Sequence, residues 1–234
     1  EERGHPTLEP LLTCAIAMNQ TAAMESFSRF LLAKPPQQAE PWRWEAVTIW
    51  IESIRRKNES WSDWQRRTAE TSPDLADQWT KWLSELPALI GNRDIAASRR
   101  AEALRLAGWT NPALKFQPEW LQPTEAPELR QAALQLAAAL PTRDAAALLI
   151  ESWPRLSPAL RETARQSLLG RADVAKTFLD GVKTGPLTPA NIDAETSQFL
   201  RSHRDAAIRE LAESALQTTD SSIRGTIVAE YLRS

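Results

Sequence analysis

The sequence predicts an all-α protein, folded as an α-solenoid of stacked antiparallel helix pairs. Glycine is scarce, with 7 residues in 234, and there is a single tyrosine. Apolar residues recur at three- and four-residue spacing in one segment after another, whereas sustained two-residue alternation, the pattern of a half-buried strand, is missing. The segments between these amphipathic stretches are short, so successive helices are expected to be antiparallel neighbours.

The 3.6-residue periodicity predicts thirteen helices along the chain. In HRDAAIRELAESAL, for example, the aliphatic and alanine side chains between Ile208 and Leu216 fall on one helical face. The expected helices are residues 7–18, 21–33, 41–56, 60–71, 73–89, 94–107, 126–139, 143–152, 158–169, 172–183, 190–202, 206–217 and 221–232.

A proline-rich stretch near the middle of the chain, NPALKFQPEWLQPTEAP from residue 111, interrupts this pattern because proline cannot continue a helix interior. Nine of the ten tryptophans lie at or before Trp120, whereas the segment that follows is rich in alanine and leucine. We therefore expect a Trp-rich helical subdomain with irregular repeats at 1–110, a proline-rich connection at 111–125 and a repeat subdomain at 126–234.

Four segments share a pattern in which an aliphatic residue and an arginine follow a helix cap. They are APELRQAA from Ala126, SPALRETA from Ser157, DAAIRELA from Asp205 and DSSIRGTI from Asp220. The shared arginines are Arg130, Arg161, Arg209 and Arg224, with spacings of 31, 48 and 15 residues. One helix pair accounts for the first spacing, a unit with an extra helix pair for the second, and one helix with a turn for the third.

Each position of the pattern has an expected structural role. The side-chain oxygens of Ser157, Asp205 and Asp220 can accept the free amide hydrogens of a first helical turn. Three residues after the arginine, a small buried side chain lets a neighbouring helix approach closely; these residues are Ala133, Ala164 and Ala212. The arginine itself lies at the edge of the apolar stripe, where it can reach the acidic cap of an adjacent repeat. Stacking is expected because a single helix pair cannot bury its own stripe.

The Asp-x-x-Ile-Arg-x-x-Ala core resembles the second helix of HEAT repeats, of the kind described as PBS-lyase HEAT-like. The C-terminal half, with LSPALRETARQSLLGRADVAKTFLDGVKTG, DAETSQFLRSHRDAAIRELAESAL and SSIRGTIVAEYL, is similar to a helical segment of planctomycete and verrucomicrobial membrane-bound dehydrogenase-type proteins. In that family the segment lies between a β-propeller dehydrogenase-like domain and a c-type haem domain. The resemblance implies an exported or periplasmic redox protein in which this segment is a spacer or docking scaffold.

Composition and individual residues give little sign of catalysis. A net charge of −2 argues against a dedicated polyanion binder, and the longest uncharged run, residues 10–24, is too short to cross a bilayer. Cys14 is the only cysteine, which excludes an intrachain disulfide and a cysteine-based zinc cluster. Neither His5 nor His203 has a companion at metal-ligand spacing, so surface positions are expected for both. We expect no catalytic residue, no metal and no cofactor in this segment.

Two pairs of tryptophans, Trp61 with Trp64 and Trp79 with Trp82, are spaced i, i+3 and would share a helical face. We expect these rings to pack in the core, because tryptophan fills irregular space between helices and supplies a large apolar area. The alternative is an exposed aromatic ladder that forms an interaction surface.

These observations predict a non-catalytic scaffold, spacer or protein-interaction segment. Its partners would be other domains of the same polypeptide or a second protein, and the first residue, Glu1, is consistent with a piece cut from a longer protein. Two alternatives stay open. Alkylpurine DNA glycosylases are also built from HEAT-like repeats, and a peptide-binding solenoid would use the Trp-rich half as its recognition surface.

Overall fold

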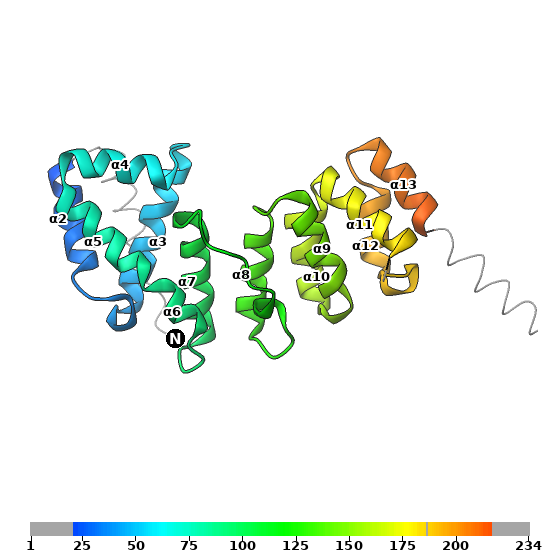
Figure 1. Cartoon of the computed structure of the whole chain (residues 1–234), viewed down its shortest axis with the longest axis horizontal. Helices are drawn as coiled ribbons and strands as arrows, with labels where there is room; N and C mark the ends of the chain where they lie inside the picture. Colours follow the sequence, from blue (N-terminus) through cyan, green and yellow to red (C-terminus); the bar gives the residue numbers. More distant parts are fainter. Residues whose placement is uncertain (1–20, 186, 217–234) are drawn as a thin grey trace, which may run out of the picture. The chain divides into compact units, whose positions relative to one another are not determined.

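A computed structural model of the chain describes residues 21–185 and 187–216, and this part is helical throughout, with no strand (Figure 1). The chain divides into two compact units, unit 1 at Glu1–Lys115 and unit 2 at Phe116–Ser234. The boundary between the units falls inside the proline-rich segment 111–125. The prediction of an all-helical protein is confirmed for the described residues.

Unit 1 contains six described α-helices and a short 3₁₀ turn, η1. Their bounds are α2 (Thr21–Leu32), η1 (Pro36–Gln38), α3 (Pro41–Arg56), α4 (Trp61–Thr71), α5 (Pro73–Ser84), α6 (Leu86–Gly91) and α7 (Ala97–Thr110). Sequence signals explain several of these ends. Pro41 and Pro73 occupy first helical positions, where the missing amide hydrogen costs nothing, and the Ser60 hydroxyl caps α4 by accepting from the Asp63 amide at 3.1 Å.

One predicted helix of unit 1, residues 73–89, is two helices in the structure. α5 ends at Ser84, and α6 begins at Leu86 after a single intervening residue, Glu85. Pro87 explains the break, because its ring nitrogen cannot donate to the carbonyl four residues earlier and its ring would clash there. The predicted helix 94–107 is also displaced and runs from Ala97 to Thr110.

A cluster of indole rings lies in the core of unit 1. Trp79 lies at its centre, with its ring centroid 5.3 Å from that of Trp61, 5.8 Å from that of Trp64 and 6.1 Å from that of Trp50. α5, which carries Trp79, packs against α2, α4 and α6. Rings this large fill the irregular space between helices that cross at different angles.

The described part of unit 2 contains three successive helix pairs separated by short 3₁₀ turns. The elements are η2 (Pro118–Leu121), α8 (Pro127–Ala137), α9 (Thr142–Ser152), η3 (Trp153–Arg155), α10 (Pro158–Ala164), the π-helical turn η4 (Arg165–Leu169), α11 (Ala172–Thr184), η5 (Pro189–Asn191), α12 (Ala194–Arg201) and α13 (Ala206–Leu216). Two expectations are corrected here: the predicted helix 158–169 changes to a π turn at Arg165, and the helix predicted from residue 190 begins at Ala194.

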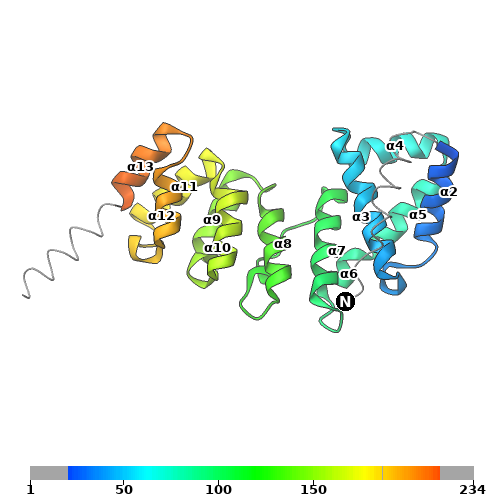
Figure 2. The same cartoon turned by 180° about the vertical axis from the view of Figure 1, so that it is seen from behind.

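In unit 2, helices pack against the helix after next along the chain. Among the first helices of the pairs, α8 contacts α10; among the second helices, α9 contacts α11 and α11 contacts α13 (Figure 2). The hydroxyl of Thr142, at the start of α9, donates to the carboxylate of Asp173, at the start of α11. Towards the other ends of the same helices, a Cβ atom added to Gly181 would lie only 2.5 Å from Cδ1 of Ile150. α9 and α11 therefore run parallel and in close contact.

The predicted helices 7–18 and 221–232 lie outside the described residues, as do Asp220 and Arg224 of the fourth repeat segment.

Candidate functional site

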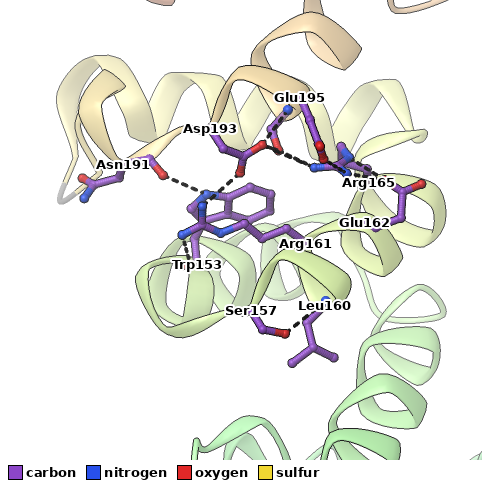
Figure 3. Close-up of polar contacts among 10 residues, drawn as sticks. Trp153, Ser157, Leu160, Arg161, Glu162, Arg165, Asn191, Asp193 and Glu195 are labelled. Atoms are coloured by element: carbon purple, nitrogen blue, oxygen red, sulfur yellow. Dashed lines mark hydrogen bonds and ion pairs between the residues drawn. The ribbon is translucent and has the colours of Figure 1, made fainter.

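The arginine singled out by the repeat pattern in α10, Arg161, joins this helix to α12 (Figure 3). Its Nη1 atom donates to Oδ2 of Asp193 at 3.0 Å, and its Nη2 atom donates to the carbonyl of Trp153 at 3.4 Å. Asp193 is the N-cap of α12 and accepts from the Thr196 amide at 2.8 Å. The expected contact between this arginine and the acidic cap of the next repeat is thus present.

A second arginine, Arg165, extends this contact into a cluster. Its side chain is only 6% exposed and donates to Thr196 Oγ1 at 3.0 Å, to Glu195 at 2.8 Å and, at 3.4 Å, to the other oxygen of Asp193. Glu162 completes the set as a further ion-pair partner of Arg165. Arg165 is the first residue of the π turn, and its carbonyl accepts from the Gly170 amide, five residues on, at 3.0 Å.

The electrostatics of this cluster favour its charged forms. Partial burial alone would raise the pKa of Asp193, but hydrogen bonds from Thr196 and Arg161 outweigh it and lower that pKa below its ordinary value. Burial likewise opposes the charge on Arg165, yet contacts with Glu162 and Glu195 raise its pKa. Asp193 and Arg165 are therefore charged at neutral pH and join the helices by charge-assisted hydrogen bonds.

Arg130 occupies in α8 the position that Arg161 occupies in α10. It is buried, and its Nε atom donates to the carbonyl of Leu121 at 3.2 Å while its Nη2 atom donates to the carbonyl of Arg155 at 2.9 Å. Burial lowers the pKa of Arg130, with the nearby charge of Arg155 acting in the same direction. Both arginines thus reach a carbonyl in the 3₁₀ turn before their own helix and a second group further along the chain.

Arg209 differs from these two arginines, and its predicted equivalence with them is wrong. It lies on α13, the second helix of its pair, whereas Arg130 and Arg161 lie on first helices. Its Nη1 atom donates to the carbonyls of His203 at 2.8 Å and Arg204 at 3.1 Å, both in the turn that leads into α13. The 48-residue spacing therefore spans one helix pair and one further helix, because the match jumps from a first helix to a second.

The other positions of the repeat pattern have the predicted packing roles. Ser157 caps α10 by accepting from the Leu160 amide at 3.4 Å, and Asp205 accepts from the Ala207 amide at 2.9 Å. The three small residues are fully buried: Ala133, Ala164 and Ala212.

The four paired tryptophans are core residues. Trp61, Trp64, Trp79 and Trp82 are exposed by 6%, 9%, 0% and 3%. Their rings contact one another or neighbouring tryptophans, and the Trp79 indole N–H donates to Ser28 Oγ at 2.8 Å. These four residues therefore do not form an exposed aromatic ladder, because their faces are used for packing between helices.

His203 is buried, contrary to the surface position expected for it. Its Nδ1 atom accepts from the Asp205 amide at 3.1 Å, which helps to form the turn into α13. Within residues 21–185 and 187–216 no three His, Cys, Asp or Glu side chains gather as a metal site.

A separate polar contact lies between α3 and α7 of unit 1. The Thr48 hydroxyl donates to Oε1 of Glu102 at 3.2 Å, and burial raises the pKa of this carboxyl despite the opposing charge of Arg99. Burial also lowers the pKa of Arg99, whose guanidinium carbon lies 4.6 Å from the ring centroid of Trp44.

Sequence reasoning missed Arg165, Asp193 and Glu195. A signal for the last two existed in the letters DAET, where an aspartate precedes a helix and can cap it. Placing the start of this helix at residue 190 hid that role.

Comparison with protein-family models, curated proteins and solved structures gives no match. No helix of the described ranges is long and apolar enough to span a membrane.

Proposed function

We propose that this chain is a non-catalytic helical-repeat scaffold, in which unit 2 is an α-solenoid that spaces or docks other domains. The packing of helices two steps apart supports this, since in a solenoid each repeat buries its apolar face on the next. Arg130 and Arg161 also support it, because their donors are directed to a turn carbonyl and a helix cap of the same unit.

The observation that carries the proposal is the equivalence of α8 and α10 at an offset of 31 residues. Leu129 and Leu160, Arg130 and Arg161, and Ala133 and Ala164 are paired at this offset, and each member of a pair has the same kind of burial or contact. If two repeats are equivalent in this way, one of them can be deleted without changing which side of each remaining helix faces the core.

Deletion tests this directly. Removing residues 134–164 joins Ala133 to Arg165 and fuses the first half of α8, in register, to the π turn η4 that follows α10. Arg130 then takes the place of Arg161 before α12. We expect a helical protein that unfolds cooperatively at a lower temperature, measured by circular dichroism, because one inter-repeat interface is lost.

Removing residues 134–162 is the matched control, because it cuts the same helices but leaves them two residues out of register. Two residues rotate a helix by about 200°, so Leu168 would turn away from the core. We expect this variant to lose cooperative unfolding. If both deletions unfold alike, the repeat proposal fails.

The resemblance of the C-terminal half of the sequence to dehydrogenase-type proteins is the reason to place the scaffold in a larger redox protein. That protein would be exported or periplasmic, and the partners of the scaffold would be domains of the same polypeptide. Visible spectra of residues 1–234, and of the chain extended by the residues that follow in its reading frame, test this in a host that matures c-type cytochromes. We expect a haem band in the longer protein only, since covalent attachment needs two cysteines and residues 1–234 contain one. If the longer protein has no haem band, the proposal of a redox protein fails. If residues 1–234 alone show dehydrogenase turnover, the proposal of a non-catalytic scaffold fails.

A further inference from the structure

We propose that unit 1 binds a small, uncharged, apolar molecule in a cavity of about 330 Å³ between α2, α3, α4 and α5. Protein interiors are close-packed and contain few voids larger than a water molecule, so a space of this size beside a core is unusual. An apolar cavity of about 150 Å³ is already enough to bind benzene. The proposal goes beyond the scaffold role of unit 2 and does not depend on it.

The inner wall of this cavity is apolar. Four buried core residues line it: Trp50 and Ile54 of α3, Trp64 of α4 and Leu75 of α5. The rings of Trp50 and Trp64 stand at 85° to each other, with their centroids 6.5 Å apart. Met24 of α2 adds an unbranched side chain that can adapt its shape to a ligand. An apolar body placed here would cover indole and aliphatic surface and would itself be removed from water.

The charged side chains of the wall lie nearer to solvent and balance one another. Lys57 and Arg67 line the cavity and are exposed, so the cavity opens to the surface beside them. Arg67 is paired with Glu59 at 2.9 Å, and Glu25 is a second acidic residue of the wall. The charged lining residues that the structure describes are therefore two positive and two negative, an arrangement without net attraction for an ion.

The half-buried hydroxyl groups of the wall are used within their own helices. Ser53 donates to the Trp50 carbonyl at 2.7 Å, and Thr68 donates to the Trp64 carbonyl at 2.9 Å. An ion held against the inner wall would lose its hydration without an opposite charge beside it, which is costly. A hydrocarbon or another uncharged apolar compound is therefore the matching class of ligand.

Three ring compounds test this class at pH 7. Ethylbenzene and benzylammonium have nearly the same shape, with a methyl group in the first where the second has an ammonium group, and benzoate supplies the opposite charge. Each compound is titrated into residues 1–234 with ¹³C-labelled methyl groups on isoleucine, leucine and methionine. We expect ethylbenzene to bind more than about tenfold more tightly than either ion, because only the ions lose charge hydration on entry.

The methyl signals locate the bound molecule. The ring current of ethylbenzene should shift the signals of Met24 and Ile54 until the site is saturated. These two signals are identified by their loss in Met24→Leu and in Ile54→Val. The signal of Ile208, a buried residue of α13 in unit 2, is identified in the same way through Ile208→Val and should not move.

A filled cavity gives the second test. Thr68→Phe should occupy the space and abolish ethylbenzene binding. Thr177→Phe in α11 is the matched control and should bind normally, because Thr177 is also half-buried and also donates to the carbonyl four residues earlier. An ion that binds as tightly as ethylbenzene, an Ile208 shift as large as that of Ile54, or unchanged binding by Thr68→Phe would each overturn the proposal. If Thr68→Phe does not fold, the affinities and methyl shifts of the unchanged protein still decide.

Discussion

The guanidinium of Arg161 lies 3.0 Å from the carboxylate of Asp193, and the same carboxylate caps the helix that follows. One aspartate therefore both starts α12 and fastens it to α10. Because Arg165 approaches the other oxygen of Asp193, the start of α12 is held by two arginines from the preceding repeat. Loss of this contact should therefore lower the stability of unit 2 more than loss of the contacts made by other surface arginines of the unit.

Replacing Arg161 by alanine should lower the free energy of unfolding by about 1–2 kcal/mol, as expected for hydrogen bonds to a charged, partly exposed acceptor. Urea denaturation measures the change. Arg155→Ala is the control, because that side chain is 50% exposed and its ion pair with Glu151 is 3.7 Å long. The control should stay within about 0.5 kcal/mol of the parent protein. Equal midpoints for the two variants would identify Arg161 as an ordinary surface arginine.

Acid should weaken the same contact. The folded-state pKa of Asp193 is lowered, so its carboxylate stabilises the fold fully above the unfolded pKa of about 3.9, and this is lost as the pH falls through the folded value. Asp193→Asn keeps an oxygen to cap α12 but removes the charge. The free energy of unfolding of this variant should lie below that of the parent protein by a constant amount between about pH 5 and 8, and the difference should shrink below about pH 4. A deficit that is independent of pH down to the acid limit would contradict the assignment.

Much of the helical framework could be predicted because its signals are local. The stripes of α3 and α13 and the proline at the start of α3 are visible in the letters, and these helices lie where the periodicity places them. The burial of the paired tryptophans follows from the same reasoning, since rings spaced i, i+3 share a face and that face is the apolar one.

The contacts of the site were harder to predict because they depend on where helices meet. Arg165 looks like a residue of a regular helix, and the π turn that begins there leaves no mark in a 3.6-residue pattern. The residues around Arg209 match those around Arg161, yet Arg209 lies on the second helix of its pair and Arg161 on the first. A short motif could therefore not distinguish the first helix of a pair from the second. Pairing partners 30 residues apart are set by packing, which a single sequence does not display.

Gly181 offers a test of the contact between α9 and α11. Alanine favours a helix interior over glycine by about 1 kcal/mol, but at this position its Cβ would lie 2.5 Å from Cδ1 of Ile150. Cδ1 is the end of a flexible, half-buried side chain that can turn aside, so we expect the cost of moving Ile150 to offset the helix gain and Gly181→Ala to leave the stability almost unchanged. In an Ile150→Ala background the same change should stabilise the protein by about 1 kcal/mol, because the obstructing atoms are gone. Thermal unfolding of the four proteins in this double-mutant cycle gives the coupling, and additive effects would show that the helices do not meet here.

Glu102 should make unit 1 less stable as the pH rises. Burial raises its folded-state pKa, so its contribution is favourable below the unfolded pKa of about 4.3, where the carboxyl is protonated, and is lost as the pH rises through the folded value. Glu102→Gln keeps an oxygen to accept from Thr48 and cannot ionise. This variant should therefore unfold at a higher temperature than the parent at pH 7, with the gain disappearing near pH 4. Glu70→Gln, on the exposed side of α4, is the matched control and should leave the unfolding temperature almost unchanged at both pH values. A lower unfolding temperature for Glu102→Gln at pH 7 would mean that the attraction of Arg99 outweighs the cost of burying the carboxylate.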